Sequence, residues 1–232
     1  MNRGAINTVV FMLIGLAGLG GMAAIFTSSG QKVDNQRTSD KLAKALNDMH
    51  LRQGAAHASL KARADRLGLG ACLTASRLAS TEQVHACLAA VDSLHALLDE
   101  RDRLAATQYA DDRSVVASLP AGPVRDEAMR GMAASTERMR QAREEMSRAE
   151  LANADAVRVA LQWADKNHAA LHVRGESLLV SSQRQLDELQ RLSAAVNATA
   201  QAARVAEQRE STVVDEADRT QLALVRQFNA MY

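Results

Sequence analysis

The sequence predicts an all-α protein, in which one N-terminal transmembrane helix is followed by an elongated antiparallel helical bundle with coiled-coil-like seams. The first observation behind this prediction is an apolar run without any charge at residues 9–26. The second is the scarcity of turn residues, because only two prolines are present and only three glycines follow Gly70; strands need such residues between them. The third is composition: 47% of residues are hydrophobic but only 3% are aromatic, so alanine dominates, which suits closely packed helices.

Residues 9–26 are expected to cross a membrane, after a short leader at residues 1–8. A helix of this length spans about 27 Å, close to the hydrocarbon thickness of a bilayer. A cleaved signal peptide is the alternative, because Arg3 supplies a basic region and residues 21–23 resemble a cleavage site. The apolar run is longer than a usual signal-peptide core, so we expect a retained, single-pass anchor in a bacterial inner membrane. The polar residues 27–40 are expected to form a juxtamembrane linker.

A first helical hairpin is expected at residues 41–110. Its first helix carries a heptad-like apolar stripe that ends at Gly68 and Gly70, and a short helix is expected over residues 71–79. Ser80 and Gln83 have the spacing of a capping box, which predicts that the next helix begins at Thr81. The buried face of that helix is expected to consist of one series of residues, with Arg101 as its only break: Val84, Cys87, Val91, Leu94, Leu98 and Ala105.

Residues 111–122 are expected to form a connection, and residues 123–232 a long second hairpin. Pro123 suits the first turn of a helix. The absence of glycine and proline from residue 132 to residue 174 predicts continuous helix there, with a turn at Gly175. In the last helix, Glu207 and Glu210 interrupt the apolar face. This pattern leaves two alternatives, one helix that carries a polar patch or a kink near residues 207–212.

The two cysteines, Cys72 and Cys87, lie symmetrically about the predicted start of a helix, so a helical hairpin would bring them to the same height. We expect them to form a disulfide, with two buried thiols as the alternative. A zinc site with His85 matches no standard ligand spacing. A disulfide favours an oxidising compartment and therefore a periplasmic body. The basic residues that follow the apolar run favour a cytoplasmic body instead; they are Lys32, Arg37, Lys41 and Lys44.

No catalytic, cofactor-binding or metal-binding residues are predicted. His168 and His172 have the spacing of a helical metal chelate, but no third ligand is identifiable, and exposed histidine pairs are common on helices. No nucleophile and base can be paired, so the chain is not expected to be an enzyme. A net charge of +1 provides no electrostatic reason for binding nucleic acid.

The expected function is that of a non-catalytic, membrane-anchored helical scaffold or adaptor of a bacterial envelope assembly, such as a secretion, conjugation or phage-related apparatus. Its partners would be the lipid bilayer, through residues 9–26, and other membrane or envelope proteins, with a homo-oligomer also possible. The plan of an anchor followed by long helices is also similar to periplasmic sensory four-helix bundles. That resemblance implies the alternative function of ligand binding, for which Asn153, Trp163 and Asn167 share one predicted helix face.

Overall fold

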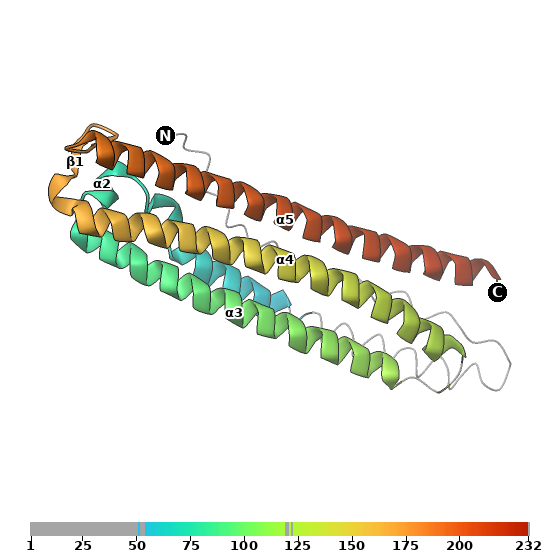
Figure 1. Cartoon of the computed structure of the whole chain (residues 1–232). Helices are drawn as coiled ribbons and strands as arrows, with labels where there is room; N and C mark the ends of the chain where they lie inside the picture. The colour runs from blue at the N-terminus through green and yellow to red at the C-terminus, as the bar shows by residue number, and fades with distance from the viewer. Residues whose placement is uncertain (1–50, 52–53, 119–120, 122, 232) are drawn as a thin grey trace. The chain divides into compact units, whose positions relative to one another are not determined.

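The computed structural model describes residues 51, 54–118, 121 and 123–231. Three long helices, α3 (Thr81–Ala117), α4 (Pro123–Asn167) and α5 (Gln183–Met231), pack antiparallel to their chain neighbours (Figure 1). The predicted helical bundle is thereby confirmed. The leader, the apolar run 9–26 and the linker 27–40 lie outside the described residues. Within the described part of the chain, every helix is too short or too polar to cross a membrane.

The described chain packs as two compact units, and the three long helices contribute to both. The first unit comprises residues 60–102 and 144–207. The second comprises the described residues among 54–59, 103–143 and 208–231. A helical segment at residues 54–66 contributes to both units and ends at Gly68, which has a φ of 61°. This left-handed conformation is the one that a helix-terminating glycine adopts at little cost, as the sequence predicts.

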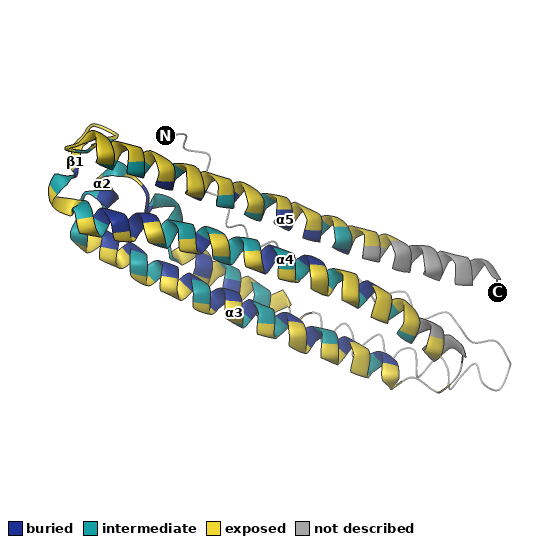
Figure 2. Ribbon diagram, viewed as in Figure 1, coloured by how far each residue is buried: buried dark blue, intermediate teal, exposed yellow. Residues whose placement is uncertain are grey.

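Helix α3 begins where the sequence predicts. The Ser80 hydroxyl accepts a hydrogen bond from the backbone N–H of Gln83 at 3.4 Å and so caps the first turn. All members of the predicted apolar series, from Val84 to Ala105, are buried, and Figure 2 shows that buried residues recur along the helix. Before α3, residues 71–79 do not form the one short helix expected there: a 3-10 helix covers Leu69–Ala71 and α2 covers Ala75–Leu78.

Two predicted helix ends are wrong. Helix α3 continues to Ala117, so residues 111–117, expected in a connection, are helical. This stretch contains no glycine or proline, and Val116 is buried, so packing extends the helix past the acidic pair Asp111 and Asp112. Helix α4 begins at Pro123 as predicted, but it ends at Asn167 and does not continue to residue 174.

A local side-chain contact accompanies the end of α4, and the absence of glycine and proline does not reveal it. The Asn167 side chain donates a hydrogen bond to the Trp163 carbonyl at 2.8 Å, which satisfies a C-terminal acceptor of the helix. A 3-10 turn, η3 (His168–Ala170), then leads into two short antiparallel strands, β1 (His172–Arg174) and β2 (Ser177–Leu179). The sequence predicts no strands here, so these two correct a purely helical assignment.

Gly175 does turn the chain, within this β-hairpin. Arg174 pairs with Ser177, which leaves Gly175 and Glu176 as a two-residue loop. Gly175 has a φ of 62°, whereas Glu176 does not have positive φ. This combination is that of a type II′ turn, which places glycine at its first central position. Helix α5 then runs without interruption through residues 207–212, so no new helix begins there.

Within the first unit, polar side-chain pairs define how α3 lies against α4. His85 Nε2 donates to Asp165 Oδ1 at 2.9 Å, and Arg158 Nη2 donates to Asp92 Oδ1 at 2.6 Å. From His85 to Asp92 the chain advances along α3, while their partners Asp165 and Arg158 follow each other in the reverse order along α4, so the two helices are antiparallel. The Thr199 hydroxyl of α5 donates to Asn153 Oδ1 of α4 at 3.1 Å. These contacts place the beginnings of α3 and α5 beside the end of α4.

Candidate functional site

The first unit has two elaborate connections at one end of its helices, and we call this region the tip (residues 67–80 and 168–182). Residues 67–80 lead into α3, and residues 168–182 join α4 to α5. Both are longer than the roughly 2–8 residues that usually connect helices in bundles. They also pack together, because α2 lies against β2. Long connections held on a rigid scaffold are common places for binding sites.

The disulfide between Cys72 and Cys87 ties the first connection of the tip to α3. The two Cα atoms are 5.7 Å apart, and both cysteines are buried. The expected pairing is therefore present in the structure, although Cys72 follows a 3-10 turn and is not on a second hairpin helix. The Arg77 guanidinium lies 3.8 Å from Cys87 Sγ and also comes from the tip. Burial of the disulfide shields it from soluble thiols.

The hairpin presents apolar and basic side chains to solvent. Val173 and Leu179 are each 44% exposed, and Leu186 at the start of α5 is 36% exposed. Around them, residues 166–184 contain three basic side chains, Lys166, Arg174 and Arg184, against the single acid Glu176, a net charge of +2 with histidines neutral. All four of these charged residues are exposed. By the pairing register Val173 and Leu179 lie on opposite faces of the hairpin, so both faces expose an apolar side chain, and basic residues outnumber acidic ones around them. Exposed apolar side chains in a stretch of net positive charge are a candidate interaction surface.

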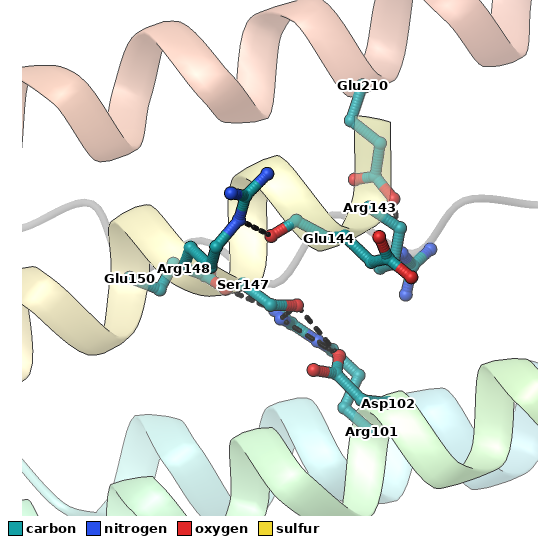
Figure 3. A network of polar contacts seen from close by, with 8 residues as sticks. All are labelled: Arg101, Asp102, Arg143, Glu144, Ser147, Arg148, Glu150 and Glu210. Atoms are coloured by element: carbon teal, nitrogen blue, oxygen red, sulfur yellow. Dashed lines mark hydrogen bonds and ion pairs between the residues drawn. The ribbon is translucent and has the colours of Figure 1, made fainter. Parts of the chain in front are cut away.

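A buried charged cluster lies between α3 and α4 in the first unit. Arg101, only 4% exposed, forms an ion pair with Glu150 at 2.6 Å and donates from Nη2 to the Ser147 hydroxyl at 2.8 Å. That hydroxyl donates in turn to Asp102 Oδ1 at 2.9 Å, as Figure 3 shows. A buried ion pair with further hydrogen bonds fixes one helix register, because shifting either helix would bury an unpaired charge.

The second unit contains its own buried polar layer. Arg143 of α4 forms an ion pair with Glu210 of α5, whose side chain is almost completely buried. Burial raises the pKa of the Tyr109 phenol, and Glu210 and Asp112 raise it further, whereas Arg143 opposes them. Glu210, which interrupts the apolar face of α5 in the sequence, is thus part of a buried contact between α4 and α5.

Asp112 is the most strongly perturbed group of this layer. It is 8% exposed, and its Oδ1 atom has no hydrogen-bond partner among the described residues. Burial raises its pKa to about 6, with a smaller contribution from the negative charge of Asp111. A carboxylate held in this way destabilises the fold while it is ionised.

The structure does not assemble the residues that the sequence suggests for metal or ligand binding. His168 lies in η3 and His172 in β1, so they do not share a helix face. Within the described ranges, no group of three or more His, Cys, Asp or Glu side chains is placed to hold a metal. Asn153 and Asn167 have their amide groups in contacts with Thr199 and with Gln185, respectively. The Trp163 indole is buried, and its Nε1 has no hydrogen-bond partner in the described part of the chain.

Sequence reasoning missed Arg101, Asp112 and the hairpin. Arg101 is a break in the predicted apolar series, yet a charged residue on such a series is itself the signal of a buried pair. Its partner Glu150 lies on another helix, so the sequence does not identify it. For the hairpin, the signal was Gly175 between two short runs rich in Val and Leu.

Comparison with known proteins adds no assignment: no protein-family model, no curated protein and no solved structure matches this chain.

Proposed function

We propose that the chain is a non-catalytic, membrane-anchored helical scaffold of a bacterial envelope assembly, which docks a partner protein through its tip. In this proposal residues 9–26 hold it in the inner membrane, and the helical body lies in the periplasm. The observation that carries the proposal is the tip itself. Two long connections meet there, pack through α2 and β2, and are fixed to α3 by the disulfide.

The disulfide supports the periplasmic location. Disulfides persist in oxidising compartments, whereas a cytosolic pair stays reduced. The Cys72–Cys87 link closes a short loop and has no catalytic sequence context such as a C-x-x-C motif. A structural role in a periplasmic body accounts for it. A cytoplasmic body, favoured by the basic residues after the apolar run, would leave this pair without its oxidising environment.

The buried ion pairs support a structural role for the long helices. Arg101 with Glu150 fixes α3 against α4 in the first unit, and Arg143 with Glu210 fixes α4 against α5 in the second. Such pairs add little net stability compared with apolar residues, but they penalise every other register. A scaffold requires a single helix register, because the position of the tip depends on the positions of the helices that carry it.

Photo-cross-linking in the native cell tests the proposal. A photoreactive amino acid is placed at Val173 or Leu179 of the tip in the full-length protein. Val159 of α4 and Val205 of α5 are matched controls, since both are exposed valines of the same unit outside the tip. We expect one discrete cross-linked product from the tip positions and none from the controls.

The disulfide supplies a second arm of this experiment. Replacing Cys72 and Cys87 together by serine removes the staple, so the tip product should fall strongly while the protein level stays measurable. Equal cross-linking from tip and control positions, or none from the tip in cells that assemble the apparatus, would contradict docking through the tip.

A ligand-binding bundle remains the second candidate, favoured only by the unpaired Nε1 of the buried Trp163. A small polar ligand accepting that hydrogen would change the tryptophan fluorescence, and Trp163 is the only tryptophan of the chain. Titration of the full-length protein with amino acids, sugars and carboxylic acids would reveal a saturable change. We expect none if the scaffold proposal is correct.

A further inference from the structure

We propose that the outer edge of β1 receives an extended, acidic segment of the partner protein, which adds a third strand to the hairpin. This inference rests on the proposed docking function of the tip and names the chemistry of the partner.

The strand pairing leaves one edge of β1 open. Strand β1 pairs only with β2 among the described residues, and α2 packs against β2, the other strand. All three residues of β1 are exposed. The side chains of His172, Val173 and Arg174 make no hydrogen bond or ion pair within the described chain. An exposed strand edge of this kind is a template for a further strand.

The pairing register indicates which backbone groups are available. Arg174 and Ser177 flank the two-residue loop and therefore form a hydrogen-bonded pair. Hydrogen-bonded and non-hydrogen-bonded pairs alternate along an antiparallel ladder, so Val173 and Leu178 form a non-hydrogen-bonded pair. The N–H and C=O groups of Val173 then point away from β2, toward the open edge. An added strand would bond to Val173.

The side chains at this edge select the chemistry of the added strand. Arg174 and His172 lie on one face of the hairpin, since residues two apart in a strand share a face, and Val173 lies on the other. In the chain, the hairpin is flanked by two further exposed basic residues, Lys166 and Arg184, and the stretch 166–184 contains one acid, Glu176. A strand that alternates acidic and apolar residues would place carboxylates beside Arg174 and His172 and an apolar side chain beside Val173.

A second copy of the chain fits this edge poorly. Antiparallel pairing of β1 with itself about Val173 would place His172 opposite Arg174 of the other copy. The same pairing would place the two Arg174 side chains at diagonal positions on one face, within reach of each other, and their like charges would repel. Charge complementarity therefore favours an acidic partner over self-association.

The experiment uses the full-length protein in detergent and short fluorescent peptides. One peptide alternates glutamate with valine, a second has lysine in place of glutamate, and a third is the acidic peptide with N-methylated backbone. Fluorescence anisotropy measures binding. We expect saturable binding of the acidic peptide only, because the lysine peptide meets like charge and the N-methyl groups block strand pairing.

Two variants with matched controls locate the binding. Val173→Pro removes the outward N–H, which an edge strand tolerates, and should abolish binding with an unchanged melting temperature. Arg174→Glu should weaken binding of the acidic peptide by roughly fivefold to tenfold. The controls Val205→Ala and Arg191→Glu change exposed residues of α5 and should leave binding unchanged.

Several results would overturn strand addition. They are equal binding of the acidic and lysine peptides, no binding of the acidic peptide, and binding that Val173→Pro does not alter. Concentration-dependent self-association that Val173→Pro abolishes, or binding to phosphatidylglycerol vesicles that requires Val173, would assign the edge to a second copy or to lipid. If tip cross-linking in cells persists when the peptide result is negative, the scaffold proposal stands and only strand addition fails.

Discussion

Replacing Asp112 by asparagine should stabilise the protein at neutral pH and have no effect in acid. Asparagine has the same shape as aspartate but no charge, so it removes the cost of burying a carboxylate. The pKa of Asp112 is raised from 3.8 to about 6. At 1.36 kcal/mol for each pKa unit, this difference corresponds to about 3 kcal/mol.

The sign of the pH dependence follows from proton binding. Between pH 3.8 and about 6 the folded protein holds the Asp112 proton more tightly than the unfolded chain does. The contribution of Asp112 to stability is therefore fully present below pH 3.8 and is lost as the pH rises through 6. Relative to wild type, the Asp112→Asn variant should gain up to about 3 kcal/mol above pH 7. That gain should vanish near pH 4.

Urea unfolding followed by far-ultraviolet circular dichroism, at a series of pH values from 4 to 8, measures this difference. The matched control is Asp111→Asn, which changes an exposed neighbour and removes only a repulsion. It should lower the pKa of Asp112 slightly and stabilise the protein much less. A difference between Asp112→Asn and wild type that does not change with pH would refute the reasoning, because it would show that Asp112 does not titrate in this range.

Three further predictions concern packing, the charged cluster and the anchor. Leu98→Ala should cost roughly 2–5 kcal/mol in the free energy of unfolding, since Leu98 is almost fully buried; a loss below about 1 kcal/mol would mean that this face is not core. Arg101→Leu should cost about 3–5 kcal/mol because it breaks the buried ion pair with Glu150, whereas Arg63→Leu, which breaks an exposed pair, should cost about 1 kcal/mol or less. Intact-mass measurement should show that residues 9–26 are retained, and a mature mass lacking the first 23 or 24 residues would contradict the anchor.

The sequence was sufficient for the features that depend on local chemistry. The Ser80 cap, the Pro123 start and the buried series from Val84 to Ala105 follow from spacing alone, and each is present. The pairing of Cys72 with Cys87 also followed, although the expected geometry did not, because a 3-10 turn and the short α2 occupy the place of a second hairpin helix.

The features that the sequence did not predict depend on contacts between distant residues. Arg101 lies on an apolar series and is tolerated only because Glu150 and Ser147 reach it from α4. Glu210 of α5 is likewise tolerated because Arg143 of α4 forms an ion pair with it. At the end of α4 the Asn167 side chain bonds to the Trp163 carbonyl, and the following strand β2 packs against α2. Helix-period counting contains none of this information.

The oxidation state of Cys72 and Cys87 in living cells tests the account most directly, because both the stapled tip and the periplasmic body depend on it. Cells are lysed into a thiol-alkylating reagent in denaturant, and the mass of the full-length protein counts the alkyl groups. We predict none before reduction and two after reduction, for protein taken straight from the membrane. Two alkyl groups without reduction would contradict the account, since the tip would then have no staple and the basic residues after the apolar run would favour a cytoplasmic body.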